Sequence, residues 1–132
     1  MPESTADGFG RVLVAVYAVF ALAATARSTV QIATRFADAP GAYLLSGLAG
    51  VVYIVATVAL GLGRDSARGA ALVAILIELI GVLTVGTLSV ADPELFPDAT
   101  VWSDFGRGYG YVPLVLPFVG LWWLRRTRGS AQ

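Results

Sequence analysis

One carboxylate, Glu78, lies within an otherwise apolar run over residues 69–91, and it is the residue best placed for chemistry. A helix needs about 20 apolar residues to cross the roughly 30 Å of bilayer hydrocarbon, so this run predicts a membrane span. A carboxylate at mid-depth costs about 3 kcal/mol to insert and normally faces a partner or a wet cavity. Glu78 is therefore predicted to serve a ligand, ion or proton, or to fix helix register in a structural ion pair.

Arg27 is the candidate partner of Glu78. Counted from Arg11 and Arg68 as cytoplasmic markers, Arg27 lies about 24 Å and Glu78 about 15 Å into the membrane, at 1.5 Å per residue. Two long side chains can bridge that difference, so the sequence allows the pair; the alternative is that Arg27 reaches the outer interface. Gln31 projects from the same helix face as Arg27, which predicts a polar lining that opens outward.

The segment over residues 92–107 is predicted to be an outer loop. With the residues that follow it, the loop is expected to form a roof over the helices, to which Trp102 and Tyr109 belong. Arg107 is expected to pair with Asp104 or to contact an anionic head group. The acidic residues of the loop do not follow the spacing of an EF-hand, so they are interpreted as solvated and no metal site is predicted.

Two prolines, Pro113 and Pro117, stand four residues apart in the last apolar run. Proline removes a helical hydrogen bond and kinks the helix, which frees the carbonyl four residues earlier. The spacing predicts a helix hinge, with a static kink as the alternative.

The residue types that are absent restrict the chemistry further. The chain has no His and no Cys, and all nine of its basic residues are Arg. Without His, Cys or Lys, the most common general base, the thiol nucleophile and the Schiff-base amine are missing, so an enzyme is not expected. Common haem and metal ligands are missing too, so no cofactor is predicted. A net charge of zero gives no basis for nucleic-acid binding.

The elements that must position these residues are predicted to be four membrane-spanning helices in a single domain, residues 1–132. The chain is 57% hydrophobic and 14% charged, which is typical of a membrane protein. Arginines gather on one side of the spans and acidic residues on the other, so the positive-inside rule predicts that both termini are cytoplasmic. We therefore expect an all-α, antiparallel, multi-pass bundle in the plasma membrane. The predicted spans cover residues 11–36, 41–63, 69–91 and 108–125.

The first of these spans has an alternative interpretation. Ala24-Thr25-Ala26 has the small residues of a signal-peptide cleavage site. The acidic residues Glu3 and Asp7, with only Arg11 as a cation, disfavour a signal peptide, so a retained span is expected.

Two long stretches are distinctive: AVYAVFALAATARSTVQIATRFADAPGAYLLS and LFPDATVWSDFGRGYGYVPLVLPFVGLWWLRR. They resemble small four-span integral membrane proteins of actinobacteria, whose function is unknown. The resemblance covers most of residues 11–126. It implies the span count and the plasma-membrane location, and it implies no active site.

Two functions are compatible with these features. The first is binding or transport of a small anion, lipid head group or proton-coupled solute, with Glu78 as a titrating or counterbalancing group and Arg27 and Arg107 on the anionic group. The second is a non-catalytic accessory protein whose polar residues serve assembly. A lipid-modifying enzyme using the outer acids is a third, disfavoured by the lack of His and Lys. The lipid bilayer is an expected partner. Small-residue faces such as Ser46 and Gly50 predict close helix contacts, either within the bundle or with further copies of the chain.

Overall fold

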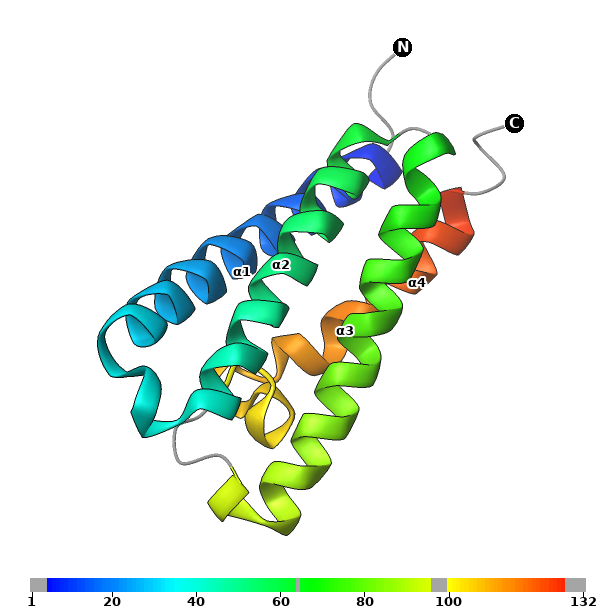
Figure 1. Ribbon diagram of the computed structural model, residues 1–132. Coiled ribbons are helices and arrows are strands. Elements are labelled where there is room, and N and C mark those ends of the chain that lie inside the picture. The colour runs from blue at the N-terminus through cyan, green and yellow to red at the C-terminus, as the bar shows by residue number, and fades with distance from the viewer. Residues whose placement is uncertain (1–4, 64, 96–99, 128–132) are drawn as a thin grey trace.

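A computed structural model describes residues 5–63, 65–95 and 100–127, and all regular structure in these ranges is helical (Figure 1). The described residues form four α-helices, with one short 3-10 segment between the first two helices and two between the last two. Their bounds are α1 Thr5–Arg35, η1 Phe36–Asp38, α2 Pro40–Leu62, α3 Asp65–Ala91, η2 Pro93–Leu95, η3 Ser103–Tyr109 and α4 Val112–Thr127.

Helix α2 shows how local sequence sets the helix ends. Pro40 occupies the first helical position, where a missing N–H costs nothing and the fixed φ suits a helix. At the other end Gly63 adopts a left-handed conformation, with φ of 64°, and its N–H donates to the carbonyl of Ala59. Glycine takes this conformation without a steric penalty, so the helix ends there.

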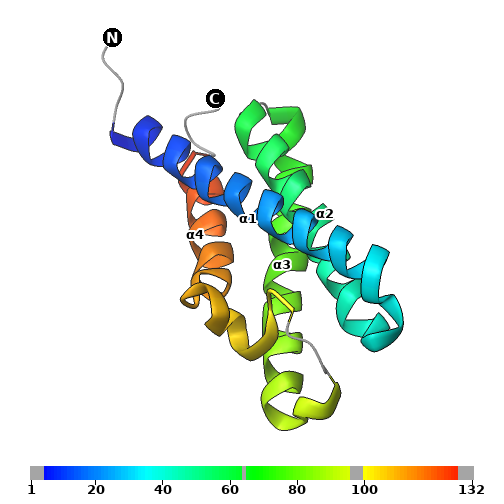
Figure 2. The same ribbon diagram turned by 90° about the vertical axis from the view of Figure 1, so that its left-hand side faces the viewer.

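The helices run antiparallel in chain order. The start of α1, the end of α2, the start of α3 and the end of α4 lie at one end of the molecule, while η1 and η2 lie at the other (Figure 1). Figure 2 shows α1 crossing obliquely over the face formed by the other three helices.

Among the described residues, three helices are long and apolar enough to cross a membrane, and they indicate a membrane protein. They are Gly8–Asp38, which includes η1, Pro40–Leu62 and Ser66–Ala91. The predicted fourth span differs, because α4 begins at Val112 instead of residue 108 and has 16 residues. At 1.5 Å per residue it covers about 24 Å, short of the roughly 30 Å of a full span.

Side-chain size distinguishes the inside from the outside of the helices. The buried residues of α2 are small residues, tyrosines and one valine: Ala42, Tyr43, Ser46, Ala49, Gly50, Val52, Tyr53, Ala56 and Ala59. Large aliphatic side chains of the same helix are exposed, among them Leu44, Leu48, Val51 and Val58. Small inward residues allow close helix contact, and an apolar exterior suits lipid, so this distribution agrees with a membrane protein.

Candidate functional site

The segment over residues 100–111, just before α4, enters the helical bundle instead of lying over it. Trp102, predicted to belong to a roof over the helices, is 1% exposed, and its ring lies directly over Gly81 of α3. Gly81 is about 15 Å from the outer end of α3 at Ala91, counted along the helix. The indole Nε1 donates to the hydroxyl of Tyr53 on α2 at 3.1 Å. The predicted roof is therefore anchored within the bundle by Trp102.

A second aromatic contact holds the same segment nearer the end of α3. The ring of Phe105 lies against Gly86, where a Cβ would be only 2.3 Å from it. The N–H of Asp104 donates to the Ser89 hydroxyl oxygen at 2.7 Å. Glycines at both ring contacts leave space that any other residue would fill, so α3 carries two sockets for the loop's aromatic side chains.

Three non-glycine residues of this segment have left-handed backbone conformations: Asp104, Phe105 and Tyr111, with φ of 51°, 61° and 61°. Such conformations cost about 1–3 kcal/mol each and persist where surrounding contacts impose them. The contacts of Trp102 and Phe105 with α3 supply that constraint. They also explain why α4 starts late, because the helix resumes only after Tyr111.

Replacing Tyr111 with asparagine is expected to stabilise the protein by about 1 kcal/mol, because asparagine tolerates the left-handed conformation better. Tyr111 is 47% exposed, so the change sacrifices little packing. Denaturant unfolding in mild detergent measures the effect. Tyr111→Phe keeps the strain and should leave stability unchanged, and a destabilised asparagine variant would contradict this account.

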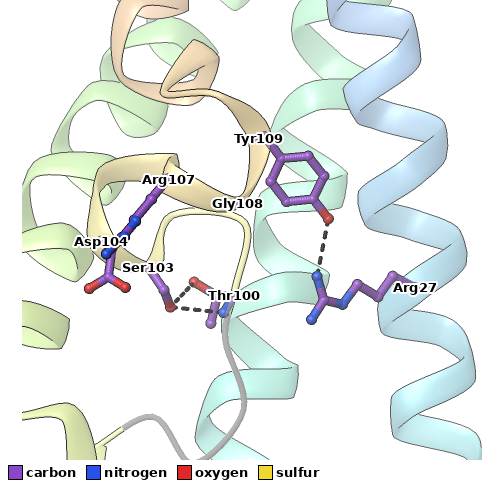
Figure 3. A pocket seen from close by; sticks show the side chains of 7 residues that line it. All are labelled: Arg27, Thr100, Ser103, Asp104, Arg107, Gly108 and Tyr109. Atoms are coloured by element: carbon purple, nitrogen blue, oxygen red, sulfur yellow. Dashed lines mark hydrogen bonds between the residues drawn. The ribbon is translucent and has the colours of Figure 1, made fainter.

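A partly open pocket of about 620 Å³ lies between α1 and this segment (Figure 3). Its lining combines two guanidinium groups, one carboxylate and several hydroxyls. The lining residues are Arg27, Thr100, Ser103, Asp104, Arg107, Gly108 and Tyr109. Three predicted site residues, Arg27, Arg107 and Tyr109, therefore meet in one cavity although α1 is far from the loop in the chain.

Hydrogen bonds shape the pocket wall. Arg27 reaches across from α1, and its Nη1 donates to the Tyr109 hydroxyl at 3.1 Å (Figure 3). The N–H of Thr100 donates to the Ser103 hydroxyl oxygen at 2.8 Å, which closes a tight turn. The Arg107 side chain is exposed, and its guanidinium makes no hydrogen bond or ion pair with the described residues; the backbone carbonyl of Arg107 accepts a hydrogen bond from the N–H of Gly110 at 3.2 Å. Two cations and one anion give the lining a net positive charge.

Comparison of the chain with known protein families, curated proteins and solved structures finds no match.

Glu78 lies apart from this pocket. It is 0% exposed, and its Oε1 accepts a hydrogen bond of 2.7 Å from the hydroxyl of Tyr17 on α1. Arg27, the partner suggested by the sequence, binds Tyr109 instead. It stands about 15 Å beyond Tyr17 along α1, at 1.5 Å per residue, which is too far to reach the carboxylate. The depth estimate failed because α1 crosses the other helices obliquely (Figure 2), so equal residue counts along α1 and α3 do not give equal depths.

The remaining predicted residues occupy different places. Gln31 is 4% exposed on α1 and does not line the pocket, and its Oε1 has no hydrogen-bond partner among the described residues. Pro113 is the second residue of α4 and packs against Gly106, so it interrupts no helical hydrogen bond. Pro117 alone stands inside the helix, and both prolines are buried.

Sequence reasoning missed several residues that build the site. Tyr17 and Tyr53 carry hydroxyl groups inside long apolar runs, and Gly81 and Gly86 interrupt an apolar helix. Buried tyrosine usually finds a hydrogen-bond partner, and helical glycine is unfavourable unless something packs on it. These signals were present in the sequence. Their partners depend on tertiary contacts.

Proposed function

We propose that this protein is an integral membrane protein that binds an oxyanion, of the phosphate type, in the pocket beside Arg27 and Arg107. The observation that carries the proposal is the meeting of two guanidinium groups from distant segments in one hydroxyl-lined cavity. Guanidinium donors match the geometry of phosphate and carboxylate oxygens and bind them in a bidentate manner.

The proposed topology has four passes, with α4 as a short final pass and both termini in the cytoplasm of the plasma membrane. Arginines at the end of the bundle that holds the helix termini support this orientation by the positive-inside rule. One of them, Arg68, donates to the Thr127 hydroxyl at 3.2 Å and to the Leu124 carbonyl, which joins α3 to α4 at that end. The pocket then opens toward the outside.

The level of the pocket favours an anion near the membrane surface. Asp104 of the lining contacts Ser89, which is two residues before the end of α3. Two sources supply an oxyanion at this level: an anionic lipid head group and a small solute outside the cell. Asp104 repels a bound anion, which offsets part of its attraction to Arg27 and Arg107. Because charge alone then binds the anion less tightly, the site favours anions that also accept several hydrogen bonds.

Arg27→Gln and Arg107→Gln are each expected to weaken oxyanion binding about tenfold or more, since a hydrogen bond to a charged group contributes about 1.5–3 kcal/mol. Calorimetric titration with inorganic phosphate tests the solute, and native mass spectrometry with phosphatidylglycerol against phosphatidylcholine tests the lipid. The matched control is Arg126→Gln, because Arg126 lies over the Trp122 ring at the opposite end.

The outcomes separate the two sources. Saturable phosphate binding without a preference for phosphatidylglycerol identifies a solute. A preference for phosphatidylglycerol without saturable phosphate binding identifies a lipid head group. Binding of neither, or binding that both glutamine variants retain, overturns the proposal. Movement of the anion across the bilayer is the transport form of the proposal and is tested by flux into liposomes.

The second candidate is an accessory membrane protein whose polar residues serve assembly. The bond from Arg27 to Tyr109 favours it, because this cation also ties α1 to the loop. In that case Arg27→Gln lowers stability and no ligand is found.

A further inference from the structure

The two oxygens of the Glu78 carboxyl group have different surroundings. Oε1 accepts from Tyr17, while Oε2 is buried and has no hydrogen-bond partner among the described residues. A buried carboxylate oxygen without a donor is costly, and such groups in native proteins usually mark a function. In the charged form of Glu78, the protein therefore stabilises Oε1 with a hydrogen bond and leaves Oε2 without one.

A series of side-chain contacts starts at this carboxyl group and returns to the same helix, α3. Glu78 binds Tyr17, the Tyr17 ring is 6.1 Å from the Tyr53 ring, and the Tyr53 hydroxyl binds Trp102. Trp102 in turn lies on Gly81, which shares a face of α3 with Glu78 because the two are one turn apart. Among the described residues, the titratable groups that act on Glu78 are Tyr17 from α1, through its hydrogen bond, and Tyr53 from α2, through the electrostatic interaction of the two groups. The Leu116 carbonyl of α4 lies near the Tyr17 hydroxyl, and the loop indole bonds the Tyr53 hydroxyl.

The hydroxyl of Tyr17 has two possible acceptors. It donates to Glu78 Oε1 at 2.7 Å, and the carbonyl oxygen of Leu116 on α4 is 3.5 Å away. When Glu78 is a carboxylate, Tyr17 donates to it. When Glu78 carries a proton, that proton is donated to the Tyr17 oxygen, and the Tyr17 hydroxyl is released to donate to Leu116.

We propose that Glu78 is a proton-binding site whose occupancy tunes oxyanion affinity in the outer pocket. The coupling rests on the proposed function; the proton site does not. A hydronium ion supplies the proton: its O–H bond breaks and leaves water, an O–H bond forms on the Glu78 carboxylate, and the product is a neutral acid. The site thus makes binding of the anion proton-dependent.

Two physical links connect Glu78 to the pocket. The first is mechanical: Tyr17 acts on Leu116 of α4, and Pro113 at the start of α4 packs on Gly106 of the loop that lines the pocket. The second is electrostatic, because neutralising Glu78 removes a negative charge near the anion. The two are about 15 Å apart, the rise along α1 from Tyr17, which bonds Glu78, to Arg27, which lines the pocket. At an effective dielectric constant of about 20, removing this charge strengthens anion binding roughly fivefold.

Infrared difference spectroscopy between alkaline and acidic buffer tests the proton site without any ligand. We expect a C=O stretching band of a buried protonated carboxyl that is present in the native protein and in Asp38→Asn, an exposed acid, and is absent in Glu78→Gln. Tyr17→Phe should shift the band, because the carboxyl loses its hydrogen-bond partner. A spectrum identical in the native protein and Glu78→Gln would overturn the proton site.

Sulfate titrations test the coupling, since the charge of sulfate does not change near neutral pH. The native protein and Asp38→Asn should bind sulfate roughly fivefold more tightly in acid than in alkali. Glu78→Gln should bind at every pH with the affinity that the native protein reaches in acid, because it resembles the protonated state. Glu78→Gln that keeps the full pH dependence would refute the coupling. Absence of sulfate binding in every variant would instead refute the oxyanion pocket and leave the infrared result to decide the proton site.

Discussion

Gly81→Ala is expected to expel the Trp102 ring from α3 and to destabilise the protein by about 2–3 kcal/mol. A Cβ at this position would lie 2.5 Å from the ring, well inside contact distance, and the ring has no free direction because it is buried. Overpacking a fixed interior typically costs this much. Unfolding in mild detergent measures the loss, and quenching of tryptophan fluorescence by a water-soluble quencher reports the displaced indole.

Gly69→Ala is the matched control for this substitution. Gly69 lies on the same helix, and apart from its chain neighbours and the adjacent helix backbone no atom lies within 4 Å of the position that its Cβ would take. Alanine has the higher helix propensity, so this variant should be unchanged or slightly stabilised. Equal stability of the two variants would show that the Trp102 socket does not hold the loop.

The all-helical fold could be predicted from apolar runs and their flanking residues. Predicted spans over residues 41–63 and 69–91 correspond to helices Pro40–Leu62 and Asp65–Ala91. Pro40 and Gly63 set the ends of the first of these through local backbone preferences, which a sequence reader can see. Such local signals do not depend on how the helices pack.

The loop before α4 could not be predicted in the same way. Residues 108–111 are apolar or small and extend the following apolar run, so a count of hydropathy assigns them to a span. Instead, Gly110 and Tyr111 have left-handed backbone conformations that end the loop, and Trp102 and Phe105 fix the preceding segment in sockets on α3. That constraint comes from tertiary contacts with α3, so hydropathy counted over residues 108–111 and their neighbours does not reveal it.

The candidate site was predictable in its residue types and not in its pairing. The sequence predicted one pocket that held six residues, and three of them, Arg27, Arg107 and Tyr109, lie on the wall of the observed pocket. The other three, Gln31, Glu78 and Trp102, do not line it. The suggested pair of Arg27 with Glu78 was wrong because helix tilt changes depth without changing sequence distance. The hydroxyl of Tyr17 bonds to Glu78 where the arginine was expected. Because this hydroxyl is neutral, it does not balance the charge of a Glu78 carboxylate.

Trp102→Ala is expected to destabilise the protein by about 3–5 kcal/mol, the usual effect of removing a buried large aromatic side chain. The substitution leaves a cavity over Gly81 and removes the bond from the indole to Tyr53. Trp102→Phe keeps much of the apolar contact and loses that bond, so it should cost less. Denaturant titration in one detergent compares the two variants, and equal losses would mean that packing over Gly81 is unimportant.

Combining Trp102→Ala with Gly81→Ala separates the socket from general damage. Once the indole is absent, the alanine methyl group has space, so the second substitution should cost far less than it does alone, with a coupling of about 1–3 kcal/mol. The strained backbone at Asp104 and Phe105 then loses one of its anchors, and the Arg107 side of the pocket should lose its fixed position. Oxyanion affinity should therefore fall in Trp102→Ala even though Trp102 does not line the pocket. Additive losses with unchanged affinity would contradict this link between the buried indole and the pocket.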